Sequence, residues 1–268
     1  MQRIDFHQPW QLSDSIRLQL VSNYAPLKAS LVDCFGRVYY TANLQQKQED
    51  ELNPGSYIYE IDIALNIFDE GLYWLKVECG SPIATTLISE PLKIAETHEK
   101  TVLLAYKHRQ HKDGAIFETG FAPTLRVPGA IRFKQPASRD TLYEDQELNL
   151  ALLDSRSYRL YELILGEWCG VPDYYIDIVD RILGCSEVKG DGRQFTKSDG
   201  AKWEESSVED YEMRGWKIEL RDSINRGSLE WENDELVTGT MAVVINVDSK
   251  GFGVNDNGGS IYQVTDIN

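Results

Sequence analysis

Cysteine is scarce in this chain, which has only four in 268 residues. Their separations match neither the paired spacing of a zinc site nor the pattern of a disulfide-rich scaffold. We therefore expect reduced, mostly buried thiols and no structural metal. A chain of this length buries about 75% of the surface that its unfolded form exposes, so it needs no such cross-links to fold. The four residues are Cys34, Cys79, Cys169 and Cys185.

Long apolar runs are also missing. No stretch approaches 18 consecutive apolar residues, which excludes a membrane-spanning helix and a membrane partner. The first six residues, Met1 to Phe6, lack the basic segment and apolar core of a secretory signal. We therefore expect the chain to fold in a cytoplasm.

Positive charge is in deficit, with 27 Lys and Arg against 43 Asp and Glu and a formal net charge of −16. The excess acid is spread along the chain, since residues 1–98 hold 7 basic and 13 acidic side chains and the rest hold 20 and 30. This balance repels phosphate backbones and leaves no basic stripe, so we expect no nucleic-acid partner. It favours solubility, or a basic partner.

Recognisable catalytic motifs are absent too. The sequence holds no P-loop, no G-x-S-x-G and no G-x-G-x-x-G. Weak candidates remain, but each is better explained as solvated surface. We therefore expect no catalytic residue, no cofactor and no metal ligand, and interpret the chain as a non-enzyme. The candidates are the pair His108 and His111, the helical carboxylates Asp177 and Asp180, the adjacent Glu204 and Glu205, and the acidic and amide-rich stretch 248–258.

The most informative segment present is residues 69–77, with the sequence DEGLYWLKV. A D-x-G-x-Y run predicts a turn at Gly71, after which Tyr73 enters a strand and its hydroxyl bonds back to the backbone of the turn. This is the tyrosine corner of an immunoglobulin-like β-sandwich. Leu75 occupies the inward position that holds cysteine in antibody domains, so packing replaces the disulfide.

Short alternating strands surround this corner. Residues 16–20, 27–32, 37–41, 57–63 and 83–94 read as strands separated by turns every 8–12 residues, the pattern of a sandwich. Residues 47–51 read as a polar loop. We therefore predict an immunoglobulin-like β-sandwich over residues 1–96.

The remainder is predicted as a β-rich domain over residues 97–232 with one clear helix at about 172–183. Strands are expected at 102–106, 125–127 and 130–133, the last two split by Pro128 and Gly129. A hairpin is expected from 147–153 and 158–165, turning at 154–157. The helix is predicted to have one apolar face made of Tyr175, Ile178, Val179 and Ile182, and to end at a left-handed Gly184. Residues 233–268 are predicted as Gly- and Asn-rich strands or an arm, with 251–260 as loop.

Aromatic residues on the predicted strands suggest an alternative function. Outward-facing rings on a sandwich can stack on sugar rings. A carbohydrate-binding accessory module is therefore an open alternative, provided that the rings share one exposed face. The candidate rings are Trp10, Tyr57, Tyr59 and Trp74.

The middle of the chain carries a family resemblance. Its segments run in order through residues 100–106, 114–118, 125–129, 143–146, 152–155 and 170–185. This order resembles structural proteins of tailed phages and prophages of Bacteroides-like bacteria, over about residues 95–220. The resemblance implies a tail or tail-tip (baseplate-region) subunit of a virion that self-associates as a ring or trimer and contacts other virion proteins. A host glycan is a further partner that such a role allows, and the resemblance brings no active site.

Overall fold

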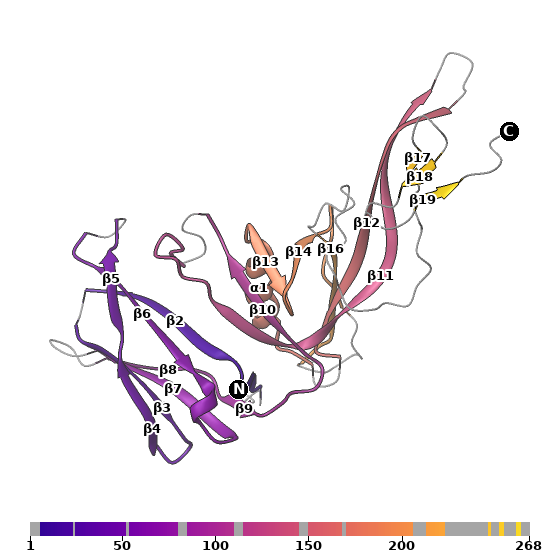
Figure 1. Cartoon of the computed structure of the whole chain (residues 1–268). Helices are drawn as coiled ribbons and strands as arrows, with labels where there is room; N and C mark the ends of the chain where they lie inside the picture. Colours follow the sequence, from indigo (N-terminus) through magenta and orange to yellow (C-terminus); the bar gives the residue numbers. More distant parts are fainter. Residues whose placement is uncertain are drawn as a thin grey trace. The chain divides into compact units, whose positions relative to one another are not determined.

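The computed structural model describes residues 6–23, 25–51, 54–79, 85–109, 115–144, 150–167, 170–205, 213–222, 246–247, 252–254 and 261–263. Residues 1–228 form one compact unit and residues 229–268 form a second. The protein is mainly β, with a single α-helix in the described part (Figure 1).

The N-terminal part is a sandwich of two sheets. In the larger sheet, β7 (Gly71–Cys79) lies between β3 (Leu27–Val32) and β9 (Leu92–Ala95). The outer strands of this sheet are β4 (Val38–Asn43), β1 (Gln8–Gln11), which runs parallel to β9, and β8 (Thr85–Ile88), which pairs with β7. The smaller sheet has the order β2 (Ser15–Ser22), β6 (Tyr57–Ala64), β5 (Gln45–Glu49). These correspond to the C, F, G and B, E, D strands of an immunoglobulin-like fold.

Alternation along these strands places one apolar face of each sheet in a common core. Leu31 and Leu75 stand opposite each other in the β3–β7 register, and both are buried. The polar stretch predicted as a loop at 47–51 instead contributes to the edge strand β5, and this prediction was wrong. Every β5 side chain is exposed, so the strand has no buried face to produce alternation.

The tyrosine corner has its characteristic hydrogen bond. The Tyr73 hydroxyl donates to the backbone oxygen of Asp69, four residues earlier, at 3.0 Å. A short 3-10 turn, η1 (Leu65–Ile67), precedes this corner. Tyr39 packs edge-on against the Tyr73 ring, with ring centroids 5.3 Å apart.

Replacing Tyr73 with phenylalanine is expected to lower the free energy of unfolding by about 1 kcal/mol, because the corner bond is lost while the ring keeps its packing. A urea melt measures the change. Tyr39→Phe is the control, because its hydroxyl bonds only an exposed carboxylate, at 3.2 Å. A loss below a few tenths of a kcal/mol for Tyr73→Phe would contradict the assigned role of the corner.

An exposed turn joins β3 to β4 at one end of the sandwich. The Asp33 carboxylate accepts hydrogen bonds from the backbone N–H groups of Phe35 and Arg37, both at 2.9 Å. These bonds fix the turn, and at its tip Phe35 is 91% exposed. Cys34, in the same turn, is exposed as well, so the expectation of a buried thiol was wrong there. The turn therefore holds an aromatic ring in water.

The second domain is a closed β-barrel. Six strands pair in a ring in the order β12–β11–β10–β13–β14–β16, and β16 pairs again with β12. Their bounds are β10 (Thr101–Lys107), β11 (Thr124–Glu144), β12 (Leu150–Leu165), β13 (Glu187–Gly190), β14 (Arg193–Lys197) and β16 (Trp216–Asp222). The short β15 (Glu204–Glu205) pairs with β16 outside the ring.

Two predictions for this domain were wrong. The strands predicted at 125–127 and 130–133 form one continuous strand, β11, which passes through Pro128 and Gly129. The stretch 154–157, predicted as a turn, lies inside the continuous strand β12. The two strands pair along almost their whole length, from Gly129 with Leu165 to Glu144 with Leu150. The actual hairpin is therefore much longer than the predicted one.

The helix α1 (Asp173–Leu183) lies where the sequence predicts it. Its buried side chains join the barrel core, but Ile178 is 41% exposed and Ile176 takes a buried position instead. Gly184 ends the helix with φ −82°, which is right-handed, so the predicted left-handed cap was also wrong. The left-handed residues nearby are Asp191 and Gly192, in the tight turn between β13 and β14.

The second unit is a small sheet of three strands. It contains β17 (Asn246–Val247), β18 (Phe252–Val254) and β19 (Ile261–Gln263), in that order. The strand β18 falls inside the stretch that was predicted as loop.

Candidate functional site

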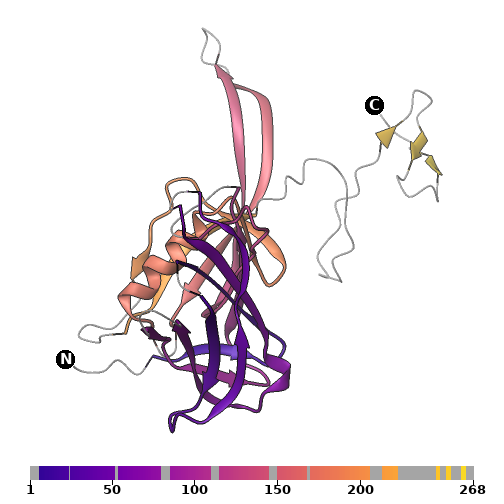
Figure 2. The same ribbon diagram turned by 90° about the vertical axis from the view of Figure 1, so that its left-hand side faces the viewer.

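A long β-hairpin extends from the barrel and is its most unusual surface. Beyond a β-bulge at Lys134, the two strands continue as an isolated ribbon of residues 134–144 and 150–159, which we call the arm (Figure 2). The pairings of β11 with β10 and of β12 with β16 stop before this ribbon begins. In the described part of the chain, both outer edges of the arm are therefore without a neighbouring strand.

Apolar side chains are concentrated at the far end of the arm. Leu142 stands opposite Leu152 in the register, and Leu150 lies two residues from Leu152 on the same strand. Because side chains alternate along a strand and cross-strand pairs share a face, these three leucines share one face of the ribbon. They are 59%, 61% and 66% exposed in the order Leu142, Leu152, Leu150. Two further exposed apolar residues of the arm are Tyr143 and Leu153.

The sandwich and the barrel are joined by a buried ion pair. Arg126 of β11 donates from Nε and Nη2 to the two carboxylate oxygens of Asp14, at 2.6 and 2.8 Å. The side chains of Arg126 and Asp14 are only 8% and 2% exposed. Arg126 also donates from Nη1 to Thr101 Oγ1 at 3.1 Å, and Asp14 accepts from the Gln11 backbone N–H at 2.8 Å. Both charges are therefore paired and hydrogen-bonded, as burial requires.

Further hydrogen bonds surround this pair. Gln8 and Tyr175 both donate to the backbone oxygen of Arg126, the tyrosine hydroxyl at 3.3 Å. Burial raises the pKa of the Tyr175 hydroxyl, which keeps it protonated and able to donate. On the other side of the junction, the Gln19 amide both donates to and accepts from the backbone of Ile116, at 2.8 Å each. Side-chain hydrogen bonds on both sides of the junction therefore link the sandwich to the barrel.

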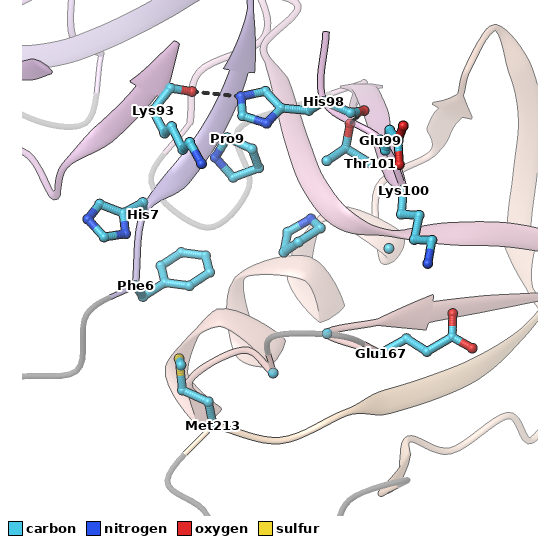
Figure 3. Close-up of a pocket in the computed structure, with 14 residues that line it drawn as sticks. Phe6, His7, Pro9, Lys93, His98, Glu99, Lys100, Thr101, Glu167 and Met213 are labelled. Atoms are coloured by element: carbon cyan, nitrogen blue, oxygen red, sulfur yellow. Dashed lines mark hydrogen bonds between the residues drawn. The ribbon is translucent and has the colours of Figure 1, made fainter. Parts of the chain in front are cut away.

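A pocket of about 300 Å³ opens beside this junction (Figure 3). Phe6, Pro9 and Met213 give it an apolar lining, while Lys93 and Glu167 lie at its border. Figure 3 shows the His98 ring turned toward the backbone of Lys93, where Nε2 lies 3.0 Å from the carbonyl oxygen. The lining mixes opposite charges over an apolar floor, and these side chains do not form a recognisable acid–base or nucleophile constellation.

The four aromatic residues considered for sugar binding do not form one exposed face. Trp10 and Tyr59 are buried, at 5% and 4% exposure. Tyr57 and Trp74 are half-buried and lie on different sheets, in β6 and β7. No two of them therefore present exposed rings side by side.

Several of the polar residues considered for chemistry make structural contacts, whereas Asp177 is exposed on the helix. Asp180 accepts from Lys197 Nζ at 2.6 Å and from the Trp203 indole at 2.8 Å. Glu204 and Glu205 pair with lysine and arginine side chains of the barrel. His108 Nδ1 accepts from the backbone N–H of Ser186 at 3.0 Å, whereas His111 and most of 248–258 lie outside the described residues.

Within the described ranges, no group of three or more His, Cys, Asp or Glu side chains is placed to hold a metal ion. None of the described helices has the length and apolar character needed to cross a bilayer.

The sequence did not reveal the arm or the ion pair. Asp14 and Arg126 are 112 residues apart, and neither is part of a motif. The leucines at 142, 150, 152 and 153 give a sequence signal for the arm, an apolar cluster on both sides of residues 145–149.

The class of protein that these features define is an immunoglobulin-like sandwich fixed to a closed β-barrel that carries an apolar arm. Comparison with protein-family models, curated proteins and solved structures finds no match to the chain.

Proposed function

We propose that the protein is a non-enzymatic structural subunit of a phage virion, in the tail or tail-tip assembly, that acts through protein–protein contacts including contacts between its own copies. The observation that carries this proposal is the arm, whose leucine face is exposed to water. Exposed apolar clusters on soluble proteins mark interaction surfaces.

The physics of an isolated ribbon supports the same conclusion. A two-stranded hairpin is only marginally stable in water by itself. Its unpaired edges are also ready templates for pairing with another chain. Burying a leucine side chain contributes roughly 1.5–3 kcal/mol, so a partner that covered Leu142, Leu150 and Leu152 would stabilise both the arm and the assembly.

The family resemblance supports a virion role for the same region. It covers about residues 95–220, which include nearly all of the barrel, the helix and the arm, and two of its segments, 143–146 and 152–155, overlap the end of the arm. The hydrogen-bonded junction suits a particle subunit, because it holds the sandwich on the barrel. The acidic surface elsewhere keeps free subunits soluble before assembly.

Replacing Leu142, Leu150 and Leu152 together with serine is expected to weaken self-association by at least about a hundredfold. The reason is that three buried apolar contacts are lost, and each factor of ten corresponds to about 1.4 kcal/mol. Light scattering across a concentration series measures the change in mass. Because all three side chains are exposed in the single chain, the triple variant should unfold at nearly the same temperature as the parent chain.

Ile67→Ser is the matched control, since Ile67 is 65% exposed but belongs to the sandwich. It should leave self-association intact. Equal association of the parent chain and the triple variant would contradict the role of the arm.

The virion role needs a separate measurement. Antibody labelling in the electron microscope, on particles released by a bacterium that carries the gene, should mark one end of the tail. Particles that lack the protein, in a preparation where the free protein is detected, would contradict a virion role.

A further inference from the structure

The sandwich has an incomplete edge at β8. In the described part of the chain, this four-residue strand pairs with β7 on one side and with no strand on the other. An edge strand presents a row of unpaired backbone N–H and C=O groups along its open side. The β8 edge is therefore a position at which another strand can pair.

The side chains of β8 show that this edge is open on the core side as well. Leu87 stands opposite Val77 in the β7–β8 register, so the two side chains share a face. Val77 is 6% exposed and belongs to the sandwich core, yet Leu87 is 54% exposed. Ile88, on the opposite face, is 64% exposed. Natural proteins usually cover such an edge or place charged residues on it, whereas here Leu87 and Ile88 are apolar and exposed.

The arm of the same chain has the unpaired backbone edges and the apolar side chains that match the β8 edge. The arm offers two unpaired strand edges and an exposed leucine face, with Leu150 and Leu152 on its β12 strand. Within one molecule the arm does not cover β8, because the arm leucines and Leu87 all remain more than half exposed. The two surfaces therefore do not meet within one molecule, and a contact between two copies of this chain would cover both at once.

We propose that the β8 edge receives the β12 strand of the arm, residues 150–159, from a second copy of this chain. The incoming strand adds to the larger sheet by backbone pairing and lays its leucines beside Leu87, which closes the core at this edge. This inference rests on the proposed function and names the receiving surface of that assembly.

Such a contact has a definite symmetry. The donor surface and the receiving surface are different parts of the chain, so the contact is heterologous. Each subunit then gives one arm and receives one, and the assembly closes as a ring when the rotation between neighbours allows it.

A photo-crosslinking amino acid in place of Leu87, in the full chain, tests the inference. After irradiation, covalent dimers should form. Mass spectrometry of their digests should identify a crosslink between residue 87 and a peptide from residues 150–159. The same crosslinker in place of Ile67 is the control and should not capture this peptide. Leu87→Asp should weaken self-association at least tenfold, as measured by light scattering. Leu87→Ser, a milder change, should also weaken self-association, and it replaces the aspartate variant if that variant does not fold.

The outcomes separate this inference from the proposed function. If the arm variant loses association but Leu87→Asp and Leu87→Ser do not, the arm joins subunits elsewhere and the β8 inference is wrong. Crosslinks from residue 87 to any other segment would also show that the β8 edge does not receive the arm. A parent chain that stays monomeric at every concentration overturns the inference together with self-association.

Discussion

Replacing Asp14 with alanine is expected to lower the free energy of unfolding by about 3–5 kcal/mol, because Arg126 would remain buried without its counter-ion. The guanidinium loses both carboxylate bonds, and a side chain that is 8% exposed has little water to replace them. Urea denaturation with tryptophan fluorescence measures the loss. Limited proteolysis should also cut earlier between the sandwich and the barrel, near residues 96–100.

Two variants make this result specific. Asp62→Ala removes an exposed partner of Arg17, in a pair whose side chains are 53% and 39% exposed, and should cost no more than about 1 kcal/mol. Changing Asp14 to leucine and Arg126 to methionine together should recover much of the loss, because no charge is then left buried alone. A cost for Asp14→Ala as small as that of Asp62→Ala would contradict the burial of this pair.

Leu75→Ala is expected to cost about 2–5 kcal/mol, because it opens a cavity in the sandwich core at the position that holds cysteine in antibody domains. Leu75 is 7% exposed and stands opposite Leu31, which is fully buried. The same denaturation experiment measures the effect, which should appear as a lower midpoint with an unchanged slope.

Leu72→Ala is the matched control, since Leu72 lies on the same strand with its side chain on the other face and is 37% exposed. It should cost much less than Leu75→Ala. Equal costs at the two positions would mean that the strand register is shifted by one residue, which would exchange the two faces.

The sandwich and the helix could be predicted from the sequence because each buries one face. In β7, and in β6 from Tyr59 onward, the buried residues alternate with exposed or half-buried ones, and this alternation is visible in the sequence. The helix was visible for the same reason, through the spacing of its apolar residues. Its one misplaced residue, Ile178, shows that spacing alone does not decide which side of an apolar stripe meets the core.

The arm could not be predicted because a strand exposed on both faces has no hydrophobic period. Residues 154–157, Asp-Ser-Arg-Ser, have the composition of a turn, yet they continue a strand because Thr141, Asp140, Arg139 and Ser138 pair with them across the ribbon. The edge strand β5 escaped prediction for the same reason. The ion pair of Asp14 and Arg126 escaped it because only the folded chain brings the two residues together.

A junction that keeps the sandwich fixed on the barrel would have a consequence for whatever the sandwich touches. In a closed ring, every sandwich would hold its β3–β4 turn, with Phe35 at the tip, at the same height and angle. A target with repeated sites would then meet several identical tips at once, and each contact after the first would form at a high effective concentration. Weak single contacts would add up to strong avidity, and a flexible junction would dilute this gain by spreading the tips over many positions.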